Sequence, residues 1–292
     1  MERKTLLRIC FCWVSLICQM ALAQNYFTGA NDGYGYDGLI FLDDHLYPYE
    51  TIDRERMSVI YNFELHSDRL PNGKLCYETT LQIGANTTCF LSSARYLVDS
   101  LYKENQNMTG ALFKACSKGN YVFFHDCYYI DLHSHRLEFT GRLAADDFKY
   151  GEILPEIEWE MTDSVATICG YSCRLATGRF RGRNYRAYYT EQIPISAGPW
   201  KFHGLPGLIL QIQDDQGLFN YKATSVRNST RGIGKCLYPY INVTRQEYQK
   251  LQKQIQANYD AFVNAHISRS GVLSASFKKK GKMKTIEPQE LE

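Results

Sequence analysis

The chain has 292 residues, and its 33 lysines and arginines nearly balance its 31 aspartates and glutamates. This balance gives no reason to expect nucleic acid as a partner, because proteins that bind nucleic acid carry clusters of positive charge. The 22 tyrosines and 15 phenylalanines favour strands, since aromatic side chains pack well on a pleated, half-buried surface.

Residues 1–23 have the order of a cleavable secretory signal. An apolar run from Ile9 to Met20 precedes Ala21-Leu22-Ala23, which offers small side chains for cleavage before Gln24. The basic residues that open such signals are Arg3, Lys4 and Arg8. The apolar run is too short for a membrane core that needs about 20 residues, and no later segment is apolar enough to span one. We therefore expect export, and a single domain over residues 24–276.

Alternating apolar and polar residues predict a series of strands after a glycine- and tyrosine-rich start that offers one short strand, Leu39–Leu42. The first clear pair is Met57–Leu65 and Leu75–Gly84, joined by a turn at Pro71–Gly73. Further predicted strands are Tyr121–Leu132, Leu137–Leu143 after a turn at His133–Arg136, a strand through Ile157, Trp159 and Met161, Thr167–Ala176, and Phe180–Thr190 after a turn at Thr177–Arg179.

Two segments have helical spacing. Apolar residues every three or four positions predict helices at about Ser92–Asn105 and Thr244–His266. Thr244 followed by Glu247 is a capping box that fixes the start of the second helix. Residues 277–292 are charged and nearly free of apolar side chains, so we expect this tail to stay disordered. The expected fold is mainly β (α+β), an antiparallel and curved meander sheet covered by one or two helices.

Seven cysteines remain after the signal: Cys76, Cys89, Cys116, Cys127, Cys169, Cys173 and Cys236. In an exported protein some of them are candidates for disulfides, and the odd number leaves at least one thiol. Cys169 and Cys173 would lie about 13 Å apart in an extended segment, beyond the roughly 7 Å that a disulfide spans, unless the chain bends at Gly170. The cysteine spacing does not resemble a zinc site.

Residues 198–213 contain an unusual run of glycine, proline and apolar residues. Gly198-Pro199 ends the preceding strand, and Trp200 and Phe202 would face one side with Lys201 and His203 on the other. Leu205–Leu208 is expected to form a type II turn, with proline at the first corner and Gly207 supplying a positive φ at the second. A strand with Leu208, Leu210 and Ile212 facing inward follows, then a turn from Asp214 to Gly217 and a strand over Leu218–Val226.

This run resembles the GLPGLI family of exported bacterial proteins. The residues that carry the resemblance are Gly198, Pro199, Trp200, Gly204, Leu205, Pro206, Gly207, Leu208 and Ile209. The resemblance extends more weakly over about Met57–Val226, and Cys89 and Cys169 depart from the family pattern. It implies a Bacteroidota source and an exported location, but no activity, because the family has no known function.

Two groups of side chains suggest ligand sites. Arg179, Arg181 and Arg183 would share one face of a strand, where guanidinium groups bind carboxylate or phosphate; a solvated face balanced by glutamates on a neighbouring strand is the simpler interpretation. His133 and His135, with His125 or Asp131, could ligate a metal. They fall in a predicted turn, however, where polar residues are common, so we expect no metal and no cofactor.

Three functional interpretations follow. The first is a non-catalytic binding or accessory protein of the periplasm or cell envelope, with release from the cell as a variant; its partner would be another envelope protein. The second, suggested by the many aromatic residues, is a periplasmic carrier of an apolar ligand such as a lipid. The third is a hydrolase of unrecognised type, although the sequence contains no nucleophile elbow and no reactive-cysteine signature.

Overall fold

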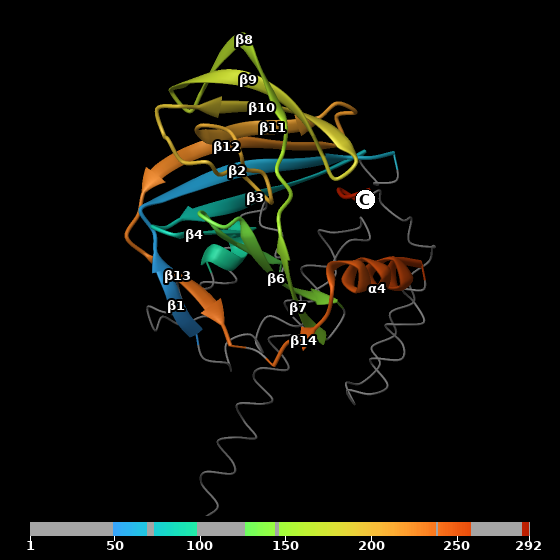
Figure 1. Ribbon diagram of the computed structural model, residues 1–292. Helices are drawn as coiled ribbons and strands as arrows, with labels where there is room; N and C mark the ends of the chain where they lie inside the picture. The colour runs from blue at the N-terminus through green and yellow to red at the C-terminus, as the bar shows by residue number, and fades with distance from the viewer. Residues whose placement is uncertain are drawn as a thin grey trace, which may run out of the picture. The chain divides into compact units, whose positions relative to one another are not determined.

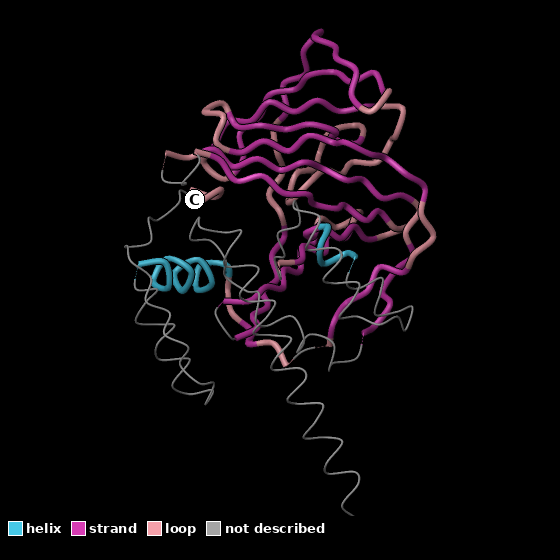
Figure 2. The backbone as a smooth tube through the Cα atoms, turned by 180° about the vertical axis from the view of Figure 1, so that it is seen from behind, coloured by secondary structure: helices cyan, strands magenta, loops and turns pink. Residues whose placement is uncertain are grey.

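The computed structural model describes residues 49–68, 73–97, 126–143, 146–237, 239–257 and 288–291. The predicted signal, the strand at Leu39–Leu42, the turn at Pro71-Asn72 and most of the helix after Ser92 lie outside these residues. Strands make up most of what is described (Figures 1 and 2). The mainly β, antiparallel fold expected from the sequence is confirmed.

The described strands form two sheets. A small antiparallel pair joins β1 (Tyr49–Arg54) to β13 (Gly232–Cys236). The large sheet has the order β14-β7-β6-β5-β4-β3-β2-β12-β11-β10-β9-β8, antiparallel except for the parallel pair β14–β7. Its strands are β2 (Met57–His66), β3 (Lys74–Ile83), β4 (Thr87–Ser92), β5 (Cys127–Asp131), β6 (Arg136–Leu143), β7 (Asp146–Ile153), β8 (Trp159–Ile168), β9 (Tyr171–Phe180), β10 (Arg183–Thr190), β11 (Leu208–Asp214), β12 (Phe219–Asn228) and β14 (Ile241–Asn242).

Strands with one buried face are found where alternation predicts them. In β2, Val59, Tyr61 and Phe63 are buried and the residues between them are only partly covered. Alternation in the sequence does not predict β4 and β7. Five of the six residues of β4 are buried, so both of its faces are covered and its sequence has no alternation to detect. In β7 only Phe148 and Tyr150 are buried, which is too short a pattern to recognise.

Two hairpin turns lie at other positions than the sequence suggested. The predicted strand Thr167–Ala176 is interrupted by a turn at Cys169-Gly170, and the predicted turn at Thr177–Arg179 lies inside β9. The second turn is Arg181-Gly182. Both residues of each turn have positive φ, the conformation that matches a two-residue loop to the twist of its strands. Because the residue at each first corner is not a glycine, the local sequence does not indicate these turns.

The large sheet is strongly curved. Arg181 in the β9–β10 turn lies 2.6 Å from Glu152 in β7, although many strands separate β7 from β10 in the sheet. In a flat sheet these strands would be about 38 Å apart, at about 4.8 Å per strand. The two halves of the sheet therefore curl towards each other on one side. This curvature brings residues that are distant in the sequence into one site.

The segment 191–207 connects β10 to β11 and packs against β11 and β8. The backbone amides of Leu208 and Ile209 donate to the carbonyls of Ile193 and Ala197, and the indole of Trp159 donates to the carbonyl of His203. The predicted type II turn is wrong, because Gly207 does not have a positive φ; Gly204 does, at 93°. Gly207 is needed for a different reason: a Cβ there would lie 2.1 Å from the Thr190 carbonyl oxygen.

Helix α4 (Arg245–Ala257) covers β6 and β7 (Figure 1). Tyr248 packs edge-on against Phe139 and Phe148. The predicted capping box is confirmed: Glu247 accepts from the amide of Thr244 at 2.7 Å, and the Thr244 hydroxyl accepts from the amide of Glu247 at 3.2 Å. A second helical stretch, residues 93–97, follows β4 and lies within the predicted helix Ser92–Asn105 (Figure 2). Neither stretch has the length and apolar character of a membrane-spanning helix.

Candidate functional site

Lys201 lies at the centre of a buried polar region inside the curl. Its side chain is 1% exposed, and its Nζ donates to the hydroxyl of Tyr150 at 3.2 Å, to Oε1 of Glu152 at 3.0 Å and to Oε1 of Glu290 at 2.5 Å. The indole ring of Trp200 lies 5.4 Å from the ammonium group. All three ammonium protons thus have acceptors, which burial of a lysine requires.

Two arginines complete the arrangement around Glu152. Oε2 of this carboxylate accepts from Nη2 of Arg181 at 2.6 Å and lies 3.3 Å from Nε of Arg245. Arg181 comes from the β9–β10 turn, Arg245 is the first residue of α4, and Glu152 lies on β7. We call the set Lys201, Arg181, Arg245, Glu152, Tyr150 and Gln249 the Lys201 cluster. Without the C-terminal segment, it holds three cations and one carboxylate.

The second carboxylate comes from the C-terminal end of the chain. Glu290 accepts from Lys201 through Oε1, and from Nη1 of Arg245 at 2.7 Å and Nε2 of Gln249 at 2.6 Å through Oε2. Burial by itself raises the pKa of Glu290, but the charges and hydrogen bonds of Lys201 and Arg245 outweigh it and lower the pKa below its ordinary value of 4.5. Glu290 is therefore an ionised carboxylate held by cations.

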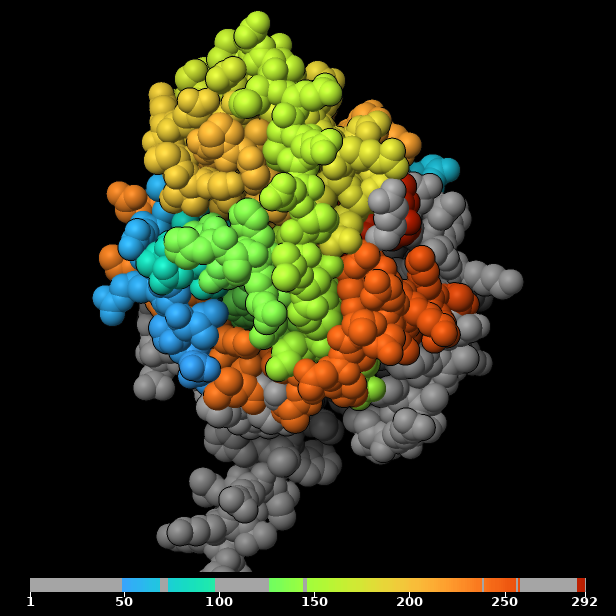
Figure 3. Space-filling model, in the orientation of Figure 1, coloured from blue at the N-terminus to red at the C-terminus, as the bar shows by residue number. Residues whose placement is uncertain are grey.

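The residues next to Glu290 are held as well. Arg183 donates to the carbonyl oxygen of Pro288 at 3.0 Å, and Tyr221 donates to Oε1 of Gln289 at 3.0 Å. The amide of Leu291 donates to the carbonyl oxygen of Arg181 at 3.0 Å. Figure 3 shows this red segment lodged between the yellow β9–β10 region and the orange helix α4. Within the tail 277–292, which was expected to be disordered, residues 288–291 make these contacts; residues 277–287 lie outside those described.

The Lys201 cluster is suited to holding a carboxylate. Burial, followed by the charges of Glu290 and Glu152, raises the pKa of Tyr150 well above its ordinary value, so this hydroxyl stays protonated and serves only for hydrogen bonding. Each charged group of the cluster faces an opposite charge. The geometry favours recognition of an anion, because charge-assisted hydrogen bonds in a dry site are strong and directional.

The three arginines proposed as an anion site do not share a strand face. Arg179 is an exposed residue of β9, Arg181 occupies the hairpin turn, and Arg183 begins β10. The prediction assumed that all three arginines lie on one continuous strand, but a hairpin turn separates β9 from β10. Even so, Arg181 and Arg183 both contact the C-terminal segment: the Arg183 guanidinium donates to the Pro288 carbonyl, and the Arg181 backbone carbonyl accepts from the Leu291 amide.

The candidate metal ligands are dispersed. The amide of His133 donates to the carboxylate of Asp131, closing the predicted turn. His135, at the end of that turn, has its ring 4.4 Å from the ring of His203. Burial lowers the pKa of His203 and keeps it neutral. In the described ranges, no three histidine, cysteine or acidic side chains are grouped as metal ligands; His125 lies outside those ranges.

No disulfide joins the cysteines of the described segments, which are Cys76, Cys89, Cys127, Cys169, Cys173 and Cys236. Cys116 lies outside these segments. The Cys169-Gly170 turn connects β8 to β9. Cys169 is therefore exposed at the tip of the hairpin, whereas Cys173 is buried in β9. Burial raises the pKa of both thiols, and raised pKa values disfavour the reactive thiolate.

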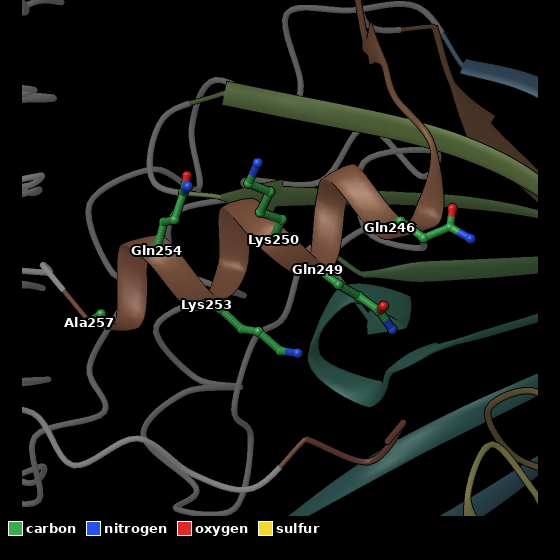
Figure 4. Close-up of a pocket in the computed structure, with 6 residues that line it drawn as sticks. All are labelled: Gln246, Gln249, Lys250, Lys253, Gln254 and Ala257. Atoms are coloured by element: carbon green, nitrogen blue, oxygen red, sulfur yellow. The ribbon is translucent and has the colours of Figure 1, made fainter. Parts of the chain in front are cut away.

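A shallow hollow of about 420 Å³ lies along α4. It is lined by Gln246, Gln249, Lys250, Lys253, Gln254 and Ala257. Figure 4 shows Lys250 and Gln254 directed to one side of the helix and Lys253 to the other. All lining residues come from one helix, so polar groups do not converge on a point as they do in the Lys201 cluster.

Sequence reasoning missed the central residues of this site. It placed Lys201 beside Trp200 and Phe202 without expecting it to be buried, and it gave no role to Glu152, Arg245 or Glu290. One signal was present: Lys201 is the one lysine in residues 198–213, a segment rich in glycine, proline and apolar residues. The partners of Lys201 are 49 and 89 residues away in the sequence, and no local pattern indicates pairs at such separations.

Comparison with known proteins gives a short family match. Residues 181–211 match a family model described as "Protein of unknown function (Porph_ging)". The match begins at Arg181, contains Lys201 and ends in β11, so it includes two cations of the Lys201 cluster. No curated protein sequence matches the chain.

Two solved structures are similar to part of the chain. One, titled "Structure of PNGF-II in P21 space group", has 13% sequence identity and a TM-score of 0.45, with 68% of this chain and 33% of that chain covered. The other, "Structure of PNGF-II in C2 space group", has 14% identity and a TM-score of 0.42, with 67% and 32% covered. The chain thus spans about a third of the length of these solved chains.

Proposed function

We propose that the chain is an exported bacterial envelope protein of the GLPGLI type that binds a partner without catalysing a reaction. The secretory pattern of residues 1–23 and the motif at Gly204–Ile209 support export, and the family match over residues 181–211 supports a Bacteroidota-type family of unknown function. The observation that carries the binding role is the Lys201 cluster, in which converging cations hold a carboxylate in a buried position.

The apolar-carrier alternative has less support. A carrier needs aromatic side chains that line a hollow, but the aromatic residues of the described sheet pack against one another. Phe63 lies 4.6 Å from Tyr221, and Phe139 lies 4.6 Å from Tyr150, measured between ring centroids. These rings fill the core between strands. Among the described residues, no specific contact favours the hydrolase alternative.

Cell fractionation tests the export half of the proposal. The full chain and a version that begins at Gln24 after an initiating methionine are expressed in a Bacteroidota host. The full chain is expected in the periplasmic or envelope fraction with the mass of a product cleaved before Gln24, and the shortened chain in the cytosol. Equal distribution of the two chains would contradict export.

Photo-crosslinking tests the binding half. A photoreactive residue replaces Gln246, an exposed residue beside Arg245 on α4; the control position is Asp163, an exposed residue of β8 far along the sheet order. A discrete crosslinked product in the envelope of living cells is expected at position 246 and not at 163. The absence of a product at position 246 would contradict a binding role for this site.

A further inference from the structure

The C-terminal segment 288–291 contacts the fold as a bound peptide would. Four different groups are recognised: the Pro288 carbonyl by Arg183, the Gln289 side chain by Tyr221, the Glu290 carboxylate by Lys201 and Arg245, and the Leu291 amide by the Arg181 carbonyl. The contacts come from the β9–β10 hairpin, β12, α4 and the motif segment. Arg181, Arg183, Lys201, Tyr221 and Arg245, which belong to these separate parts of the chain, thus form one surface that receives the segment; we call it the receiving surface.

The receiving surface requires an acid. If Glu290 left, the almost fully buried Lys201 would keep one of its two carboxylate contacts, Glu152, which also binds Arg181 and Arg245. A buried cation that loses its partner is strongly disfavoured, because it cannot recover its hydration. Emptying the site therefore favours entry of another carboxylate rather than an empty cavity.

We propose that the Lys201 cluster and its rim form a binding site for an extended acidic peptide of a partner protein, and that residues 288–291 are its tethered occupant. This inference rests on the proposed binding function and names its ligand class. The occupant defines the ligand: a carbonyl acceptor, then a side chain that accepts a hydrogen bond, then a glutamate. Leu291 is 56% exposed, so the position after the glutamate carries no requirement for side-chain size.

The tether makes the segment a competitor. Attachment gives the tail an effective concentration in the millimolar range. A free peptide therefore binds only when its own concentration is higher than that, or when its affinity for the site is greater than that of the tail. A partner that presents several acidic residues at once would meet this requirement. Weakening the tail should then expose the site to a peptide of the same sequence.

Fluorescence anisotropy measures this competition. The probe is a labelled peptide with the sequence of residues 287–292, and a second probe carries Gln in place of the glutamate that corresponds to Glu290. Both are titrated with the full wild-type chain, with Glu290→Gln, and with Glu191→Gln, a matched control whose carboxylate forms an exposed surface pair with Arg174. The Glu290→Gln chain is expected to bind the acidic probe at least about tenfold more tightly than the other two chains, since its own tail competes less.

Two further comparisons identify the site and the ligand class. Adding Arg245→Gln to Glu290→Gln should weaken binding of the acidic probe at least about tenfold, whereas adding Arg174→Gln should not change it. The Gln-containing probe should bind at least about tenfold more weakly than the acidic one. Equal binding of the two probes, or displacement of the acidic probe by free glutamate at the same concentration as by unlabelled peptide, would overturn the proposal.

A measurement on the wild-type chain keeps the test independent of variant folding. The Leu291 amide is hydrogen-bonded to Arg181, so an excess of the acidic peptide should displace the tail and increase hydrogen exchange in the C-terminal fragment. The Gln-containing peptide should leave that exchange unchanged. Unchanged hydrogen exchange with both peptides, together with no anisotropy change on titration with Glu290→Gln, would contradict the acidic-peptide site. The fractionation and crosslinking experiments test the proposed function separately.

Discussion

Lys201 is surrounded by the rings of Trp200, Tyr150 and Tyr128 and by two carboxylates. A buried ammonium group is stable here because three hydrogen-bond acceptors take the place of the water molecules that would hydrate it in solution. The same side chain on a solvated surface would contribute almost nothing to stability. Its partners therefore decide the role of the residue.

Replacing Lys201 with methionine should destabilise the protein by about 3 kcal/mol or more, because it leaves Glu152 and Glu290 buried with fewer cations. Urea unfolding of the full chain measures the loss. Arg174→Gln, which breaks an exposed ion pair with Glu191, should cost less than about 1 kcal/mol. Equal losses in the two variants would show that the Lys201 pairs contribute no more than a surface pair.

Gly207 is a second residue whose role comes from its surroundings. Gly207→Ala should destabilise the protein by about 1–3 kcal/mol, because the new methyl group would collide with the Thr190 carbonyl and force the backbone apart. Gly151→Ala is the matched control: there the nearest atom, the Leu137 carbonyl oxygen, is 3.6 Å from the new Cβ. The melting temperatures of the two variants are compared with that of the wild type. If Gly207→Ala melted at the wild-type temperature, the close approach of residue 207 to the Thr190 carbonyl would be refuted.

At the scale of elements, local sequence decides where α4 begins but not what it covers. The capping box satisfies two backbone donors at the helix start. Tyr248 and Ile255 are buried because they fall on the side of the helix that the sheet covers. The start can be read from Thr244 and Glu247 alone.

Thr244→Ala should reduce stability by about 1 kcal/mol, because the amide of Glu247 loses its capping acceptor. Gln246→Ala, an exposed change at the second residue of the same helix, should be nearly neutral, since both residues are good helix formers. Chemical denaturation of both variants provides the measurement. If Gln246→Ala cost as much as Thr244→Ala, the loss would have to be attributed to the helix surface and not to the cap.

Hairpins show the opposite behaviour. The turns at Cys169-Gly170 and Arg181-Gly182 have a glycine only at their second corner, so the sequence resembles a continuous strand. The positive φ of Cys169 and Arg181 is imposed by strand pairing on both sides. Because the turn lies at Arg181-Gly182 and not at Thr177–Arg179, Arg181 is in the hairpin turn rather than on a strand face, and there it contacts Glu152.

At the scale of the whole molecule, curvature of the sheet unites β7, the β9–β10 turn, α4 and the C-terminal segment. Glu290 is the residue through which this assembly depends on pH. Its pKa is lowered from 4.5 in the folded chain despite burial, because Lys201 and Arg245 bind the ionised form. A lowered folded pKa stabilises the protein above the unfolded value and loses that effect as the pH falls through the folded value.

The difference in stability between wild type and Glu290→Gln should therefore be largest near neutral pH, begin to shrink as the pH falls below 4.5, and disappear once the pH lies below the lowered pKa of the folded chain, where Glu290 is protonated in both the folded and unfolded states. Unfolding curves of both chains over this range give the comparison. A difference that did not depend on pH would mean that the carboxylate charge of Glu290 does not hold the tail.

The sequence by itself determined the fold class, the one-sided strands such as β2, the start of α4 and the resemblance carried by Gly204–Ile209. These features are local, since each depends on residues within one turn or one strand of each other. The tertiary structure decided where the hairpins turn, why Gly207 is glycine, and that Lys201, Glu152 and Glu290 meet. Such contacts follow from how a long sheet curls, and the energy of that curl is spread over many strands, so no short stretch of sequence records it.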